Sequence, residues 1–120
     1  MESYSVLDLF SGAGGLTEGF ARNNFQFVTH VEKDTYAIKT LETRLLYYNL
    51  CKNRSESLYR DYIKEIINRQ QFLDLYSEAD LPEIDLNHVE ISELSEKHLV
   101  RCIRKDLEAH DYKKLNVIIG

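Results

Sequence analysis

The sequence predicts an α/β fold with a doubly wound, mostly parallel sheet. Short apolar runs typical of strands alternate with stretches of helical periodicity. A glycine-dense turn directly follows the first apolar run, and the run 117–119 is continuously apolar, as in parallel strands buried on both faces. Right-handed crossovers then predict the strand order 3-2-1-4, with the fourth strand at an edge.

The first half of the chain supplies two strands and their helices. We expect strands at 4–10 and 25–31 and a short helix at 16–23. Asp34 is placed to cap the next helix, 36–50, whose apolar face carries Ile38, Leu41, Leu45 and Tyr48. A second helical segment continues the periodicity through Leu58, Tyr62, Ile66 and Leu73. These segments predict a helical insertion at about 50–80.

The second half begins at the only proline, Pro82, in a run that indicates a loop. A third strand is expected at 88–91 and a fourth at 117–119. Between them, Ser92 or Ser95 can cap a helix whose inner face carries Leu99, Ile103 and Leu107. An apolar edge strand at 117–119 is prone to aggregation unless more protein lies beside it.

Composition bounds the classes of protein to which the chain can belong. Its 43% hydrophobic and 29% charged residues are typical of a globular protein, and no apolar run has the ~18 residues of a membrane span. The first residues show no basic region followed by an apolar one, as a secretory signal would, and two cysteines are too few for a disulfide framework, so we expect a cytoplasmic location and reduced thiols. The net charge of −5 disfavours a free-standing DNA-binding module.

The turn after the first strand has the features of a nucleotide-cofactor site. Gly12, Gly14 and Gly15 let backbone N–H groups approach a ligand closely, and the following helix presents its positive end to the turn. Glu32 follows the second strand, where such sheets place the acid that binds ribose hydroxyls. The dinucleotide fingerprint G-x-G-x-x-G would need a glycine where this chain has Thr17, which argues against binding of a nicotinamide cofactor.

The run Asp8-Leu-Phe-Ser-Gly-Ala-Gly-Gly-Leu16, followed by Val31-Glu-Lys-Asp34 and Tyr36-Ala37, resembles the first two motifs of the DNA cytosine-5 methyltransferases. The ending 116–120 resembles the strand that leads, in that family, into a Pro-Pro-Cys turn with the catalytic thiol. The resemblance implies a Rossmann-like methyltransferase fold, S-adenosylmethionine as the cofactor, and methylation of cytosine C5 in DNA within a restriction-modification system.

The resemblance also implies roles for particular residues. Phe10 would cover the cofactor, the turn amides would contact its methionine part, and Glu32 would bind the ribose. Lys33 stands where the family often has an apolar or aromatic residue against adenine, and Glu90-Ile91 is the best match to the motif that binds the adenine amino group. The expected cofactor-binding residues are Phe10, Ser11, Gly12, Ala13, Gly14, Gly15, Glu32, Lys33, Glu90, Ile91 and Gly120.

Asp106 is a second candidate for the acid that would bind the adenine amino group. It ranks below Glu90 because it falls in a segment with helical periodicity. No metal site is expected. Cys102, four residues after His98, fits a small core residue better than a nucleophile or a metal ligand.

The expected catalytic cysteine would lie just beyond Gly120, so we expect 1–120 to be the N-terminal part of a catalytic domain, inactive by itself. Catalysis would then need the remainder of the enzyme or a complementing subunit, which would also make most contacts to DNA. Two alternatives remain open: a non-catalytic S-adenosylmethionine-binding subunit of a split enzyme, and part of an NAD-type oxidoreductase.

Overall fold

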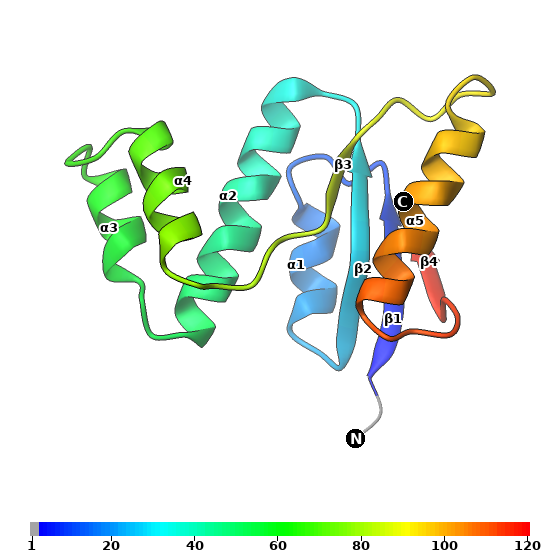
Figure 1. Cartoon of the computed structure of the whole chain (residues 1–120), viewed down its shortest axis with the longest axis horizontal. Helices are drawn as coiled ribbons and strands as arrows, with labels where there is room; N and C mark the ends of the chain where they lie inside the picture. The colour runs from blue at the N-terminus through cyan, green and yellow to red at the C-terminus, as the bar shows by residue number, and fades with distance from the viewer. Residues whose placement is uncertain (1–2) are drawn as a thin grey trace. The chain divides into compact units, whose positions relative to one another are not determined.

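The computed structural model describes residues 3–120, which form an α/β structure (Figure 1). These residues divide into two compact units, unit 1 within 3–41 and 85–120 and unit 2 within 42–84. The elements in chain order are β1 (Tyr4–Leu9), α1 (Gly15–Ala21), β2 (Phe25–Glu32), α2 (Thr35–Lys52), α3 (Ser57–Ile63), α4 (Arg69–Glu78), β3 (Leu86–His88), α5 (Glu96–Ala109) and β4 (Val117–Ile119).

The sheet of unit 1 confirms the predicted topology. Its strands lie in the order β3-β2-β1-β4, and every neighbouring pair is parallel. Strand β1 lies between β2 and β4, and its Asp8 is beside both His30 of β2 and Ile119 of β4. The carboxyl ends of all the strands therefore meet at one edge of the sheet.

Helices α1 and α5 cover opposite faces of this sheet. Leu7 of β1 packs in one buried cluster with Leu99 of α5, whereas the next residue, Asp8, contacts Thr17 of α1. Successive side chains of a strand point to opposite faces, so the two helices lie on different sides. The predicted inner face of α5 is confirmed at Leu99 and Ile103, which both pack in this cluster.

The third strand lies earlier than predicted. It spans Leu86–His88 rather than 88–91, since Leu86 pairs with His30 and His88 pairs with Glu32 at the end of β2. The Val89 N–H donates to the Glu32 carbonyl at 3.0 Å, and beyond this bond β2 offers no further residues. Glu90 and Ile91 consequently lie in a loop and not on a strand.

Strand β4 has the predicted bounds, but it is not buried on both faces. Ile118 is 61% exposed, whereas its neighbours Val117 and Ile119 are half-buried. The reason is positional: β4 is the edge strand, and the cluster formed by α5 packs on β1 and β2. The start of β4 is joined to β1 through Asn116, whose side-chain oxygen accepts the Ser5 N–H at 3.0 Å.

The predicted second helical segment is two helices in the structure. Glu65, with φ of 58°, interrupts the chain between α3 and α4. Asn68 then starts α4 with a capping box, in which its side chain accepts the Gln71 N–H and the Gln71 side chain accepts the Asn68 N–H, both at 2.9 Å. Ile66, expected on the apolar face, is 66% exposed because it lies in this break.

The predicted apolar face of α2 is confirmed at Leu41, which is fully buried, but the core of unit 2 uses other residues of the helix. Leu46 and Leu50 are buried together with Phe72 and Tyr76 of α4, whereas the predicted Leu45 is only half-buried. The cap of α2 is confirmed, since the Asp34 carboxylate accepts the Ala37 N–H at 2.7 Å. Within residues 3–120, no helix is both long and apolar enough to cross a membrane.

Candidate functional site

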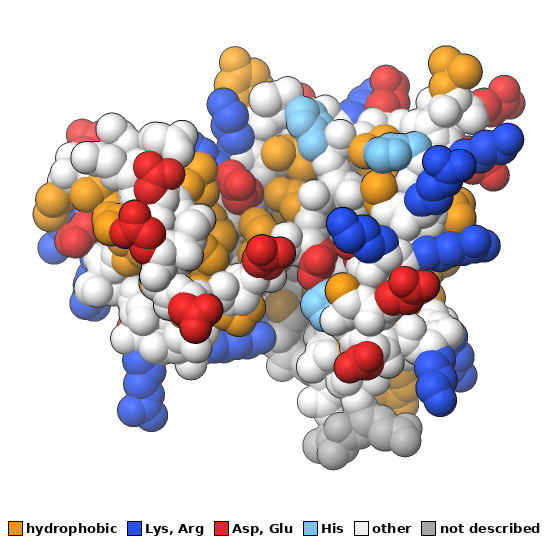
Figure 2. Space-filling view, in the orientation of Figure 1, with side chains coloured by type: hydrophobic (Ala, Val, Ile, Leu, Met, Phe, Trp, Pro, Cys, Tyr) orange, Lys and Arg blue, Asp and Glu red, His pale blue; other side chains and the backbone are white. Residues whose placement is uncertain are grey.

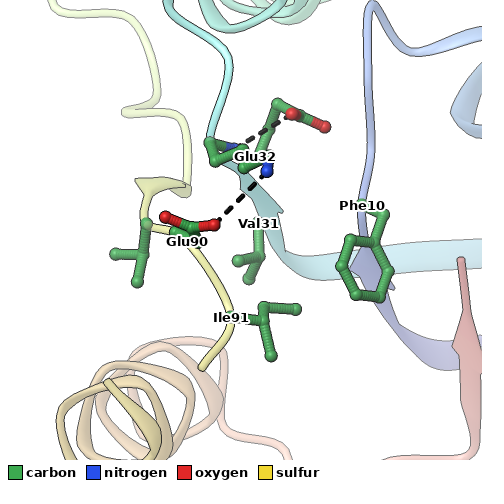
Figure 3. Close-up of a pocket in the computed structure, with 7 residues that line it drawn as sticks. Phe10, Val31, Glu32, Glu90 and Ile91 are labelled. Atoms are coloured by element: carbon green, nitrogen blue, oxygen red, sulfur yellow. Dashed lines mark hydrogen bonds and ion pairs between the residues drawn. The ribbon is translucent and has the colours of Figure 1, made fainter. Parts of the chain in front are cut away.

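A small pocket lies at the carboxyl ends of β1, β2 and β3 in unit 1 (Figure 3). Its volume is about 60 Å³. Phe10 comes from the turn after β1, and the other residues come from the ends of β2 and β3 and the segments that follow. The lining residues are Phe10, Val31, Glu32, Lys33, Val89, Glu90 and Ile91. Five of the residues predicted from the sequence, far apart along the chain, are thus brought to one place.

The backbone of the glycine turn is left-handed at three positions. Phe10 has φ of 56°, Gly12 has φ of 56° and Gly14 has φ of 90°. A non-glycine residue pays a steric cost in this region, so the Phe10 conformation is strained. The Ser11 N–H, which donates to the Val31 carbonyl at 3.0 Å, ties the turn to the end of β2. The Phe10 ring is held outward, and 67% of the residue is exposed at the pocket.

The Glu32 carboxylate is held by three backbone N–H groups. Oε2 accepts from Gly12 at 2.6 Å, and Oε1 accepts from Lys33 and Asp34, each at 3.0 Å. The Asp34 N–H is the largest cause that lowers the pKa of Glu32, and those of Gly12 and Lys33 add to it against partial desolvation. Glu32 is therefore an anion at neutral pH, and Oε2 retains one lone pair for a further donor.

Lys33 and Glu90 form an ion pair at the pocket, with Nζ to Oε1 at 3.3 Å. Their side chains are 64% and 68% exposed, so the pair contributes little to stability. Its consequence is geometric, because it joins the segment after β2 to the loop after β3. In Figure 3, Val31, Ile91 and Phe10 provide the apolar part of the same surroundings.

The remaining predicted residues lie outside the pocket lining. Ser11 is buried, and its hydroxyl donates to the Asp8 carbonyl at 3.0 Å. Gly15 is the first residue of α1, and Ala13 and Gly14 precede it in the turn. Gly120 follows β4, and a Cβ at this position would overlap the carbonyl oxygen of Leu9. Glycine at 120 therefore permits the close approach of the ends of β4 and β1.

The sequence interpretation missed the buried pair formed by Asp8 and Thr17. Both residues are almost fully buried, and the Thr17 hydroxyl donates to Asp8 Oδ2 at 2.6 Å. This bond fastens the start of α1 to β1 directly below the glycine turn. Two features of the sequence could have indicated this pair: Asp8 is an acidic residue inside an apolar strand, and Thr17 stands where a dinucleotide-binding site has glycine.

Asp106 has a structural role. Asn87 donates to Asp106 Oδ2 at 3.1 Å and to Thr29 Oγ1 at 2.8 Å, which ties α5 to β3 and β2. Asp106 does not line the pocket, so the structure disfavours it as the adenine-binding acid.

Cys102 is half-buried on α5, with its Sγ 3.6 Å from Nε2 of His98. Within residues 3–120 there is no group of three acidic, histidine or cysteine side chains that would hold a metal ion. The pair therefore lacks the third ligand that a protein metal site of this kind needs.

A sequence model of the family described as C-5 cytosine-specific DNA methylase matches residues 4–86. The chain belongs to this family. The match includes the glycine turn, Glu32 and all of unit 2. It ends before Val89, Glu90 and Ile91 of the candidate pocket.

Two curated relatives bear names that agree with the family. The chain is similar to the type II methyltransferase M.Bpa9945I of Bacillus paralicheniformis, with 29% identity over 130 residues that cover 96% of this chain and 29% of the relative. It is also similar to the type II methyltransferase M.PspPI of Psychrobacter sp., with 39% identity over 56 residues that cover 47% of this chain and 14% of that relative. The chain thus spans less than a third of the length of either. No solved structure matches it significantly.

Proposed function

We propose that this chain forms the S-adenosylmethionine-binding part of a DNA cytosine-5 methyltransferase that acts in a restriction-modification system. The observation that carries the proposal is the convergence of Phe10, Glu32 and Ile91 at one pocket, beside a turn rich in glycine. Membership of the methylase family supports a methyl donor, and the names of both relatives support a type II system.

The residues at the pocket suit an adenosine. Glu32 is anionic and has an oxygen with room for one more hydrogen bond, so it can accept from a ribose hydroxyl. A second hydroxyl would have to displace one of the N–H groups of Lys33 or Asp34. Phe10 and Ile91 offer apolar surface to the adenine ring. Lys33 can contribute apolar surface only through its methylene stem.

The pocket places the apolar side chains of Phe10 and Ile91 beside the Glu32 carboxylate. We therefore propose that adenine occupies the pocket between Phe10 and Ile91, and that the methionine part extends along the turn 11–15. Bound S-adenosylmethionine supplies an electrophilic methyl group. The work of this chain is to bind and orient that group, which contributes to the rate by positioning rather than by covalent chemistry.

The same proposal covers domain organisation. We propose that 1–120 is the N-terminal part of a catalytic domain, that the helices of unit 2 are an insertion between the second and third strands, and that the nucleophilic cysteine lies elsewhere. A thiolate would add to C6 of a flipped cytosine, C5 would take the methyl group with release of S-adenosylhomocysteine, and loss of the C5 proton with elimination of the thiolate would restore the ring. The chain would act with the rest of the enzyme or with a complementing subunit, and those parts would make most contacts to DNA.

Isothermal titration tests this proposal. The purified chain is titrated with S-adenosylmethionine, with S-adenosylhomocysteine and with NAD. We expect saturable binding of the first two and none of NAD, and we expect no incorporation of labelled methyl into DNA by 1–120 alone. Binding of NAD without S-adenosylmethionine would overturn the cofactor assignment, and methyl transfer by the chain alone would overturn the division of roles.

A further inference from the structure

The outward face of α5 carries a strip of basic side chains. Leu99 and Ile103 turn one side of this helix toward the sheet, and four cations occupy the opposite side. All four are exposed, at the spacing of successive helical turns. We call these residues the α5 strip: Lys97, Arg101, Arg104 and Lys105.

The cations of the α5 strip are free of ion pairs among residues 3–120. Three of them border an open groove of about 240 Å³ with Glu96 and Val100. Glu96 lies at the helix start and Glu108 one turn beyond the strip, so acidic groups bound it at both ends. Figure 2 shows basic side chains gathered over the part of unit 1 that contains α5.

This charge stands out because the whole chain has a net charge of −5. A protein that is acidic overall repels polyanions, and an unpaired cationic strip provides local attraction for one. Lys97 and Lys105 are eight residues apart, which corresponds to roughly 12 Å along a helix. That length is too great for one phosphate, whereas a DNA strand presents a row of phosphates to a surface of this size.

The α5 strip also begins beside the candidate pocket. The helix runs from β3 back to β4, so its N-terminus lies at the carboxyl edge of the parallel sheet. The Ser95 hydroxyl, just before α5, donates to the Glu90 carbonyl at 2.5 Å and so connects the helix start to the pocket loop. DNA that contacts Lys97 and Arg101 would therefore lie near the edge where methyl transfer is proposed.

We propose that the α5 strip binds the phosphate backbone of duplex DNA through Lys97, Arg101, Arg104 and Lys105, independently of sequence. The inference rests on the proposed function for the identity of the polyanion. It adds a DNA-contacting surface on this chain, outside the pocket. Contacts of this kind hold the duplex in register and make affinity depend steeply on salt.

The test uses the protein in its natural length and a 25-base-pair duplex, with fluorescence anisotropy in 50 to 200 mM KCl. The variant Lys97→Gln/Arg101→Gln/Arg104→Gln removes three charges from the strip. If each contacts a phosphate, the slope of log affinity against log salt falls in magnitude by about 2.7. The loss of affinity across this salt range then becomes roughly fortyfold smaller.

Two controls separate a local contact from a general change in charge. Lys52→Gln/Arg60→Gln/Lys64→Gln removes the same charge from exposed positions of unit 2, and we expect the original slope. Arg101→Lys/Arg104→Lys keeps the charge and should also keep the slope. Thermal unfolding and S-adenosylmethionine titration of each variant establish that it is folded and that its pocket is intact.

An unchanged slope in the strip variant would overturn the inference, as would an equal decrease in the unit 2 variant. Polyglutamate serves as a protein-like polyanion. If the strip substitutions abolish its binding and leave DNA binding unaltered, the surface belongs to an acidic polypeptide instead, and the inference fails. If any of these results overturns the inference while the unmodified protein still binds S-adenosylmethionine, the proposed function stands. Absence of cofactor binding in the unmodified protein would count against the proposed function.

Discussion

The Thr17 hydroxyl donates a 2.6 Å hydrogen bond to the Asp8 carboxylate, and both residues are almost completely buried. A carboxylate inside an apolar sheet is costly unless donors surround it, so this bond stabilises the first strand and helix together. It also positions the glycine turn, because the turn lies between these two residues in the chain. The proposed cofactor site therefore depends on a contact that the ligand itself would not touch.

We expect Thr17→Val to lower the free energy of unfolding by about 1–3 kcal/mol, because valine keeps the shape and removes the donor to Asp8. Urea denaturation measures this change. Thr17→Ser should retain most of the stability. Thr40→Val, at an exposed threonine of α2, provides the matched control with little expected effect. Equal stability of Thr17→Val and the unmodified protein would show that Asp8 does not need this bond.

Glu32→Ala should weaken S-adenosylmethionine binding by about 1–3 kcal/mol, since a charged acceptor for ribose is lost. Titration calorimetry measures the effect, with Glu83→Ala as a control at an exposed acidic residue outside the pocket. Glu32→Gln tests the charge. The glutamine amide has only one acceptor oxygen, whereas both oxygens of Glu32 accept N–H groups, from Gly12 on one side and from Lys33 and Asp34 on the other. An isotherm unchanged by Glu32→Ala would remove this residue from the site.

His30 predicts a specific dependence of stability on pH. Burial lowers the pKa of His30, although Asp8 and Asp85 oppose the shift, and within residues 3–120 its Nε2 is a buried atom without a hydrogen-bond partner. As pH falls through about 6.5, the unfolded chain takes up the proton before the folded chain does. The stability from neutral His30 is therefore present above that pH and declines below it.

Denaturation between pH 5 and 8 measures this contribution, whose slope cannot exceed about 1.4 kcal/mol per pH unit. We expect His30→Gln to reduce the slope below pH 6.5. Identical slopes in the unmodified protein and His30→Gln would contradict the prediction.

Asn68→Ala should reduce stability by about 1 kcal/mol, because it removes the side-chain oxygen that accepts the Gln71 N–H in the capping box that starts α4. The effect should reach the core of unit 2, since Phe72 lies in the first turns of this helix and is fully buried. Asn68→Asp preserves the acceptor and should preserve stability. Thermal denaturation distinguishes the two, and equal midpoints for Asn68→Ala and Asn53→Ala, at a surface asparagine, would show that the cap contributes nothing.

The sequence could predict those parts of the candidate site that are formed by residues close together in the chain. The strand, the glycine turn and Glu32 are read from neighbouring residues, and the structure brings Phe10, Glu32, Lys33, Glu90 and Ile91 to one pocket. The ion pair of Lys33 with Glu90 could not be predicted, because it joins residues 57 positions apart whose separation depends on the length of the intervening helices.

The amino-acid sequence by itself determined the alternation of strands and helices, the strand order 3-2-1-4 and the cap of α2 at Asp34, since each follows from periodicity, chain connectivity or a side chain acting on its own backbone. Only the tertiary structure decided that β3 ends at His88, where β2 has no more residues to pair, and that Ile118 is exposed at the sheet edge. It also decided that Leu46, and not Leu45, is buried in unit 2. Burial and pairing depend on partners distant in the chain, and periodicity does not specify those partners.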